Sequence, residues 1–223
     1  MKKFVAIVLT LSMILACCAA LAEGVMTHAD YVAAAIDSEV VVETYVQAKQ
    51  SWWDNKGTFY CQSEDGAYFL YEMQCSEEDY NKLVPGTKIK VTGYKAEWAG
   101  EVEIVDAAFE ILEGSYIAEA KDVTALLGTD ELIAHQNEFV VFKGMTVEAI
   151  EYKNGKPGDD IYVTVSKDGQ NYSFCVERYL TDPETEVYKA VGELKTGDVI
   201  DVEGYLYWYE GVNTHMTSVK AAV

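Results

Sequence analysis

Large aromatic side chains gather in the loops and hairpins of this sequence, and their flat faces suggest ligand binding. In the first half they are Trp52, Trp53, Tyr60, Tyr68 and Trp98. In the second half they are Tyr152, Tyr162, Tyr172, Tyr207, Trp208 and Tyr209. Such rings stack on sugars, on nucleic-acid bases or on the apolar side chains of a partner. The same residue types also plug small β-barrels or fill contacts between domains, so both roles stay open here.

The sequence carries no pattern typical of catalysis or metal binding. It contains no G-x-S-x-G, Walker, dinucleotide-binding or H-E-x-x-H motif. His28, His135 and His215 are isolated from one another, and we interpret each as a surface or core residue. The acidic pairs at 64–65 and 159–160 lack the spaced oxygen ligands of a calcium loop. We therefore predict a protein that is not an enzyme and has no catalytic residue, metal or cofactor.

The charge is strongly negative. Seventeen basic and 37 acidic residues give a formal net charge of −20, and Arg178 is the only arginine. Such a surface repels phosphate backbones and anionic membranes, and the shortage of arginine removes the usual bidentate phosphate clamp. The composition therefore favours a glycan or protein partner over nucleic acid.

The N-terminus is typical of a secretory signal. Lys2 and Lys3 precede an apolar run over residues 4–15, and small residues lead to Ala22, where we predict cleavage. The run is too short to span a membrane. Residues 14–17 also resemble a bacterial lipobox, so lipid attachment at Cys17, or an uncleaved signal anchor, is the alternative route to a membrane. We predict a secreted or extracytoplasmic protein of the bacterial cell envelope.

Three cysteines remain after cleavage at Ala22, namely Cys61, Cys75 and Cys175. An odd number rules out a complete set of disulfides, and no Cys/His spacing indicates zinc. We predict buried free thiols.

An internal repeat organises the chain. Residues 83–100 recur at a constant offset as residues 194–211, with seven identical positions. The shared glycines fit a turn with positive φ and a sharp bend, and the shared Ile-x-Val fits a strand with one buried face.

The remaining elements follow the same order in both halves. In the first half we predict a helix at 27–36, a strand at 40–48, a hairpin of 58–63 with 67–73, a helix at 76–83 and a last strand at 101–112. In the second we predict a helix at 129–135, a strand at 139–150, a hairpin of 161–166 with 171–177, and a helix from Asp182 to about residue 191. Alternation in the first hairpin predicts two sets of side chains. The inward set is Phe59, Cys61, Phe69, Tyr71 and Met73, and the outward set is Tyr60, Gln62, Tyr68, Leu70 and Glu72.

This order of strand, hairpin, short helix and second hairpin resembles the OB-fold, a five-stranded Greek-key barrel. The chain is similar to secreted bacterial OB-fold proteins, many of which have no defined activity. The resemblance implies a mainly β protein with two tandem barrels and short helices: a signal peptide at 1–22, a first domain at 23–113 and a second at 114–223.

The resemblance also implies a location for ligands, on the face of strands two and three between the first loop and the loop joining strands four and five. We place the binding residues there: Trp52, Trp53, Tyr60, Tyr68, Trp98, Tyr152, Tyr207, Trp208 and Tyr209. The predicted function is a non-enzymatic extracytoplasmic binding or adaptor module for a neutral glycan or a protein. The alternatives are a single-stranded nucleic-acid-binding protein, by analogy with other OB-folds, and a purely structural envelope protein whose aromatics pack between the barrels.

Overall fold

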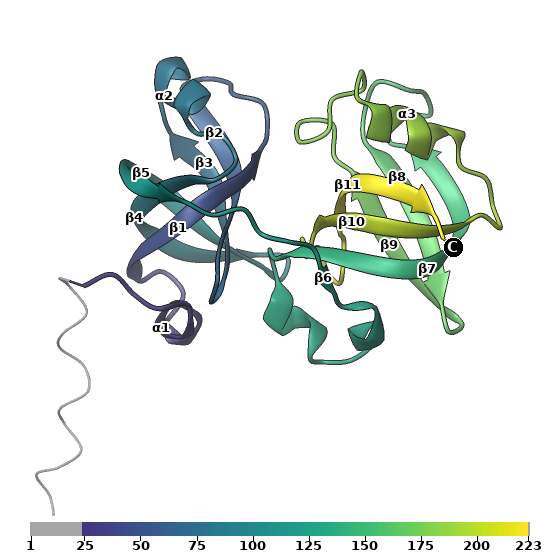
Figure 1. Cartoon of the computed structure of the whole chain (residues 1–223), viewed down its shortest axis with the longest axis horizontal. Coiled ribbons are helices and arrows are strands. Elements are labelled where there is room, and N and C mark those ends of the chain that lie inside the picture. The colour runs from purple at the N-terminus through teal and green to yellow at the C-terminus, as the bar shows by residue number, and fades with distance from the viewer. Residues whose placement is uncertain (1–23, 223) are drawn as a thin grey trace, which may run out of the picture.

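The computed structural model describes residues 24–222, and its ribbon shows two β domains side by side (Figure 1). The predicted signal peptide and the alternative lipid site at Cys17 lie outside the described residues. Within that range, no helix is long and apolar enough to cross a membrane.

The first domain is a closed five-stranded barrel. Its strands are β1 (Glu39–Lys49), β2 (Lys56–Ser63), β3 (Gly66–Gln74), β4 (Thr87–Trp98) and β5 (Glu101–Ser115), in the order β1-β2-β3-β5-β4. The β3–β5 pairing is parallel and the other pairings are antiparallel. Helix α1 (His28–Ala33) precedes the barrel, and α2 (Glu77–Lys82) connects β3 to β4. This is the topology predicted from the resemblance to the OB-fold.

The second domain repeats this strand order. Its elements are β6 (Lys121–Asp122), β7 (Phe139–Tyr152), β8 (Ile161–Lys167), β9 (Gln170–Val176), α3 (Glu186–Glu193), β10 (Val199–Tyr205) and β11 (His215–Ala221). The sheet runs β10-β11-β9-β8-β7-β6, and an additional pairing of β10 with β7 joins its two sides. Helices α2 and α3 lie at the same end of their domains (Figure 1). The chain is therefore mainly β, with two OB-fold-like sheets.

The repeated glycines occupy equivalent places. Gly86 and Gly197 have φ of 90° and 93°, and each donates its N–H to a carbonyl of the first strand in its own domain. At Gly93 and Gly204 the fifth strand passes so close that a Cβ would collide with its backbone. The turn and the close strand approach explain why both copies keep glycine at these positions.

The helices begin at side-chain caps, with one correction to the prediction. The hydroxyls of Thr27 and Ser76 cap α1 and α2, as predicted. Helix α3 is capped by Thr185 instead of Asp182 and begins at Glu186. The helix predicted over 129–135 is a single 3₁₀ turn, η2 (Leu132–His135), and a second turn, η1 (Thr124–Leu126), precedes the predicted range. Neither turn has a side-chain cap.

The predicted faces of the first hairpin are wrong for β3. Tyr68 and Leu70 point into the barrel core, whereas Phe69 and Tyr71 point out of it. An irregularity causes the error, because Glu72 has a φ of 47° and shifts the alternation before Met73 turns inward. The inward prediction is confirmed for Phe59, Cys61 and Met73, and all three described cysteines are free and buried, as predicted.

Candidate ligand-binding site

The second domain covers the outward face of strands two and three in the first barrel. Tyr60 is fully buried there, and its ring stacks on Tyr205 at 4.5 Å between centroids. The Tyr60 hydroxyl lies 2.5 Å from Nδ1 of His215. Phe69 is buried beside it, and Tyr207 packs edge-on against Phe69 at 5.3 Å. We call these five side chains the interdomain cluster.

Four further residues of the predicted site lie in, or pack against, the core of a domain. Tyr68 lies in the first core, edge-on to Tyr31 at 5.0 Å. Trp52 packs against the same core and donates its indole N–H to the carbonyl of Cys75 at 3.1 Å. Tyr152 and Trp208 pack against the core of the second domain. Tyr68 is buried and the other three are partly buried against a core, so the predicted aromatic platform does not form as expected.

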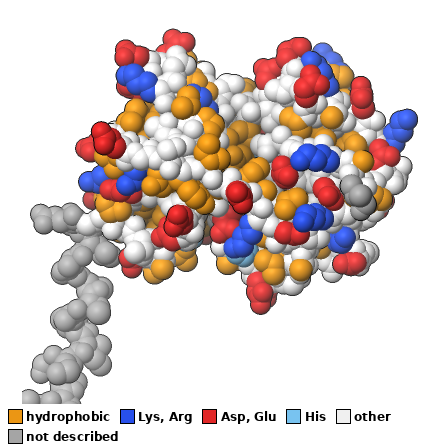
Figure 2. Space-filling view, in the orientation of Figure 1, with side chains coloured by type: hydrophobic (Ala, Val, Ile, Leu, Met, Phe, Trp, Pro, Cys, Tyr) orange, Lys and Arg blue, Asp and Glu red, His pale blue; other side chains and the backbone are white. Residues whose placement is uncertain are grey.

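A hollow at the edge of the domain contact gathers three exposed rings instead. Trp53, Tyr71 and Tyr179 are 66%, 43% and 54% exposed. They line a space of about 590 Å³ together with Gln50, Ser51, Lys56, Gly57, Thr58 and Glu72. We call this space the aromatic cleft. Hydrophobic side chains are visible along the junction of the domains, with acidic ones scattered around them (Figure 2).

Short-range backbone contacts position the rings of the aromatic cleft. Trp53 sits in the β1–β2 loop, where its backbone exchanges two hydrogen bonds with Lys56, at 3.1 and 3.0 Å. Tyr71 points outward from β3 because of the shifted alternation. Tyr179 follows β9 in the second domain, and its carbonyl accepts the N–H of Ser51 at 2.8 Å. The hydroxyl of Ser51 donates to the same carbonyl at 3.3 Å, so two hydrogen bonds join the domains beside the cleft.

Sequence reasoning found Trp53 but missed the other two rings. Strict alternation along β3 predicts that Tyr71 points inward, whereas the irregularity at Glu72 leaves it pointing outward. Tyr179 lies in an irregular segment after β9, where no periodicity marks it. Only the domain contact brings Tyr179 next to the first loop of the other barrel.

Charged groups surround the aromatic cleft. Nζ of Lys56 lies 2.8 Å from Oε2 of Glu72. Glu103 is buried nearby, and burial together with the charge of Glu72 raises its pKa to about 7. The guanidinium of Arg178 lies over the ring of Tyr179, 5.1 Å from its centroid.

A second exposed aromatic pair also spans the domains. Trp98, at the end of β4, and Tyr209, in the β10–β11 loop, are 55% and 46% exposed, with ring centroids 5.2 Å apart. The N–H of Glu210 donates to the carbonyl of Ala99 at 2.7 Å and ties the two loops together. Trp53 and Trp98 therefore mark the two loops between which OB-folds bind ligands, while the face between those loops is covered.

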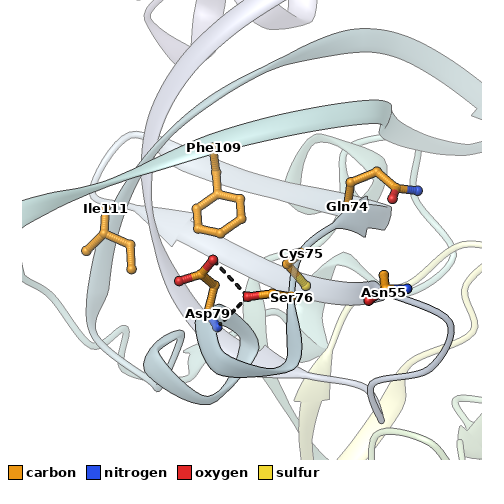
Figure 3. A pocket seen from close by; sticks show the side chains of 7 residues that line it. All are labelled: Asn55, Gln74, Cys75, Ser76, Asp79, Phe109 and Ile111. Atoms are coloured by element: carbon orange, nitrogen blue, oxygen red, sulfur yellow. Dashed lines mark hydrogen bonds between the residues drawn. The ribbon is translucent and has the colours of Figure 1, made fainter.

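Another hollow, beside α2, has no side chain among its lining residues that is set up as a nucleophile (Figure 3). Its lining residues are Asn55, Gln74, Cys75, Ser76, Asp79, Phe109 and Ile111. The hydroxyl of Ser76 is already engaged with Asp79 in capping the helix. Burial raises the pKa of the Cys75 thiol, which keeps it protonated and weakly nucleophilic. Across residues 24–222, no group of three or more His, Cys, Asp or Glu side chains is arranged to hold a metal ion.

The domain contact also contains an uncompensated buried carboxyl. Glu101 is fully buried, and burial raises its pKa to about 8. Its Oε2 accepts the backbone N–H of Trp208 at 2.9 Å, while its Oε1 and the neighbouring Oδ1 of Asn137 have no hydrogen-bond partner. Burial is the largest influence on this carboxyl and disfavours its charged form, so the neutral form suits the site.

The chain matches no family model, and no curated protein matches it. Among solved structures it resembles a murine DNA binding protein bound with dsDNA, at 12% identity and a TM-score of 0.38, over 82% of this chain and 96% of that chain. It also resembles the Ifi202 HINa domain in complex with 20 bp dsDNA, at 10% identity and a TM-score of 0.38, over 83% and 100%. A deletion mutant of the single-stranded DNA binding protein from Thermus aquaticus matches at 14% identity and a TM-score of 0.25, over 83% and 94%.

The predicted glycan or protein ligand loses its binding face in this structure, because the second domain covers that face. The matched proteins are described with DNA, against the prediction of a glycan or protein partner with nucleic acid disfavoured by charge. The covered face of the first barrel removes the surface on which that prediction relied. None of the three matches is described as a secreted bacterial protein, so the resemblance extends to the OB-fold only. Because the TM-scores lie below 0.5, the matches assign no ligand to this chain, and its own cleft has to supply the argument.

Proposed function

We propose that this chain is a non-enzymatic protein that binds single-stranded nucleic acid by stacking unpaired bases in the aromatic cleft. The observation that carries the proposal is the meeting of three exposed rings from both domains in one hollow. This hollow adjoins the first loop of the barrel, one of the places where OB-folds receive ligands. Every base has a flat face, so such a site tolerates different sequences.

Stacking, rather than phosphate neutralisation, has to supply the affinity. Each base stacked on an aromatic ring contributes about 1–3 kcal/mol. The cations beside the cleft are Lys56, which is paired with Glu72, and Arg178, which lies over Tyr179. Each phosphate neutralised contributes about −0.7 to the slope of log K against log[salt] for a single strand. Few phosphate contacts therefore give a small total slope. We expect weak binding, at about 10 μM to 1 mM, with a shallow dependence on salt.

Fluorescence anisotropy of a labelled oligothymidine about 12 nucleotides long tests the proposal. We expect binding by the native chain and a loss of about 5-fold or more in Trp53→Ala and in Tyr179→Ala. The matched control is Tyr94→Ala, because Tyr94 is 45% exposed and does not line the aromatic cleft. Absence of binding at millimolar protein, or equal binding by Trp53→Ala and the native chain, would falsify the proposal.

A structural role is the second candidate, and the interdomain cluster favours it. Aromatic side chains that were predicted to bind a ligand instead hold the two domains together. If no ligand binds while mutations in this cluster separate the domains, a structural role explains the molecule better. Secretion or lipid attachment remains a prediction from the N-terminal sequence alone.

A further inference from the structure

Acidic groups outnumber basic groups around the aromatic cleft. Glu72 lines it, Glu103 is close to Glu72, and Glu177 accepts the N–H of Tyr179 at 3.0 Å. Asp54 adds negative charge next to Lys56 and helps to raise its pKa. The basic side chains are Lys56, which is paired with Glu72, and Arg178. The local field therefore has the same sign as the whole chain, whose net charge is −20.

The rings themselves attract cations. The face of an aromatic ring is negative, and tryptophan is the strongest receptor among the aromatic side chains. Arg178 already uses this property, since its guanidinium lies over the ring of Tyr179. Trp53 is the most exposed of the three rings, so its face is open to a second cation supplied by a ligand.

We propose that the aromatic cleft selects ligands whose ring carries a positive charge, such as an N-alkylated heteroaromatic base, over the same ring in its neutral form. The ligand's ring stacks on Trp53, Tyr71 or Tyr179. The carboxylate of Glu72 balances the ligand's charge, and its ion pair with Lys56 weakens as the ligand binds. This inference rests on the stacking site of the proposed function and adds the charge of its ligand.

A pair of small probes isolates the charge. 1-Methylnicotinamide carries a permanent positive charge on its ring, whereas nicotinamide has nearly the same shape and none. Titration of the native chain, followed by tryptophan fluorescence and calorimetry, measures both affinities. A cation–π contact predicts tighter binding of the charged ring by roughly 3- to 30-fold.

Two variants assign the preference to the cleft. In Glu72→Gln we expect the preference for the charged ring to fall by at least about 3-fold, while nicotinamide binds as before. In Lys56→Met, which frees the Glu72 carboxylate, we expect the preference to increase. Tyr94→Ala, outside the cleft, should leave both affinities unchanged.

The outcomes separate this inference from the proposed function. Equal affinity for the two probes, with the oligonucleotide still bound through Trp53, overturns the inference and leaves the proposed function standing. Preference for the charged ring without oligonucleotide binding supports the inference and overturns the nucleic-acid role. If Glu72→Gln and Lys56→Met leave the preference for the charged ring unaltered, the inference is also overturned, because groups outside the aromatic cleft then recognise the charge.

Discussion

The two OB-fold domains share a strand order but use the same hairpin in opposite ways. In the first domain, β2 and β3 are buried almost throughout, because the core covers one face and the second domain covers the other. In the second domain, β8 alternates between buried and half-buried positions over residues 161–166, and most of the first half of β9 is exposed. Two domains with the same fold therefore need not offer the same binding face, because the second domain covers the outward face of β2 and β3 in the first.

The sequences of the two hairpins record this difference. The outward positions of the first hairpin carry Tyr60 and Phe69, whereas Thr164 and Ser173 face outward on the second. Two large apolar side chains on an outward face require a cover, and small polar side chains do not. The aromatic cleft survives because Trp53 and Tyr71 lie just beyond the covered area.

We expect the largest loss of stability from a substitution that disrupts the contact between the domains. Truncation of Tyr60 in Tyr60→Ala removes a buried ring and the hydroxyl that meets His215, so we expect a loss of about 3–5 kcal/mol in the free energy of unfolding. Urea denaturation measures it. The matched control is Thr164→Ala on the second hairpin, for which a change within about 0.5 kcal/mol is expected. Similar losses in both variants would mean that the two faces are equally important.

The next effect concerns the buried carboxyl of the first domain. Glu101 has a pKa of about 8 in the folded chain and about 4.3 when unfolded, so the unfolded state releases its proton first and stability falls as the pH rises from about 4 to 8. In Glu101→Gln we expect a gain of about 2–4 kcal/mol at pH 8 and almost none at pH 4. Urea denaturation across this range measures it, and a gain independent of pH would contradict the explanation.

The second domain contributes a histidine with the opposite dependence. Burial lowers the pKa of His215 to about 3, whereas the unfolded residue titrates near 6.5, so stability is lost as the pH falls through this window. His215→Asn should be less stable than the native chain at pH 7.5, because the stacking on Tyr207 is lost. Between pH 6.5 and 5 the native chain should lose about 2 kcal/mol more than the variant. Parallel curves would show that His215 does not control acid stability.

The smallest effect compares the two exposed tryptophans. Trp53→Ala and Trp98→Ala remove rings that are 66% and 55% exposed, so each should change stability by no more than about 0.5 kcal/mol. Oligonucleotide affinity should fall more in Trp53→Ala, because Trp53 shares its hollow with two other rings and Trp98 pairs with Tyr209 alone. A larger loss in Trp98→Ala would move the binding site to the other loop.

The tandem fold was predictable because the repeated residues have types that the local backbone conformation requires. Gly86 and Gly197 require a left-handed turn, and helix caps such as Thr27 act within a few residues. The faces of β3 were not predictable, since one residue with positive φ, Glu72, shifts the alternation without a distinctive sequence. Of the aromatic cleft only Trp53 was predictable, because it lies in a loop that the OB-fold places near ligands.

By itself, the amino-acid sequence determined a duplicated, acidic, mainly β chain with capped short helices and free cysteines, because these properties depend on composition and on interactions between near neighbours. The tertiary structure alone decided which aromatic rings are buried and which remain open. Tyr60 and Tyr205 are 145 positions apart in the chain, and only the docking of two barrels makes them stack. The same docking brings Tyr179 to Trp53, since a cleft between domains depends on shape complementarity that local sequence does not encode.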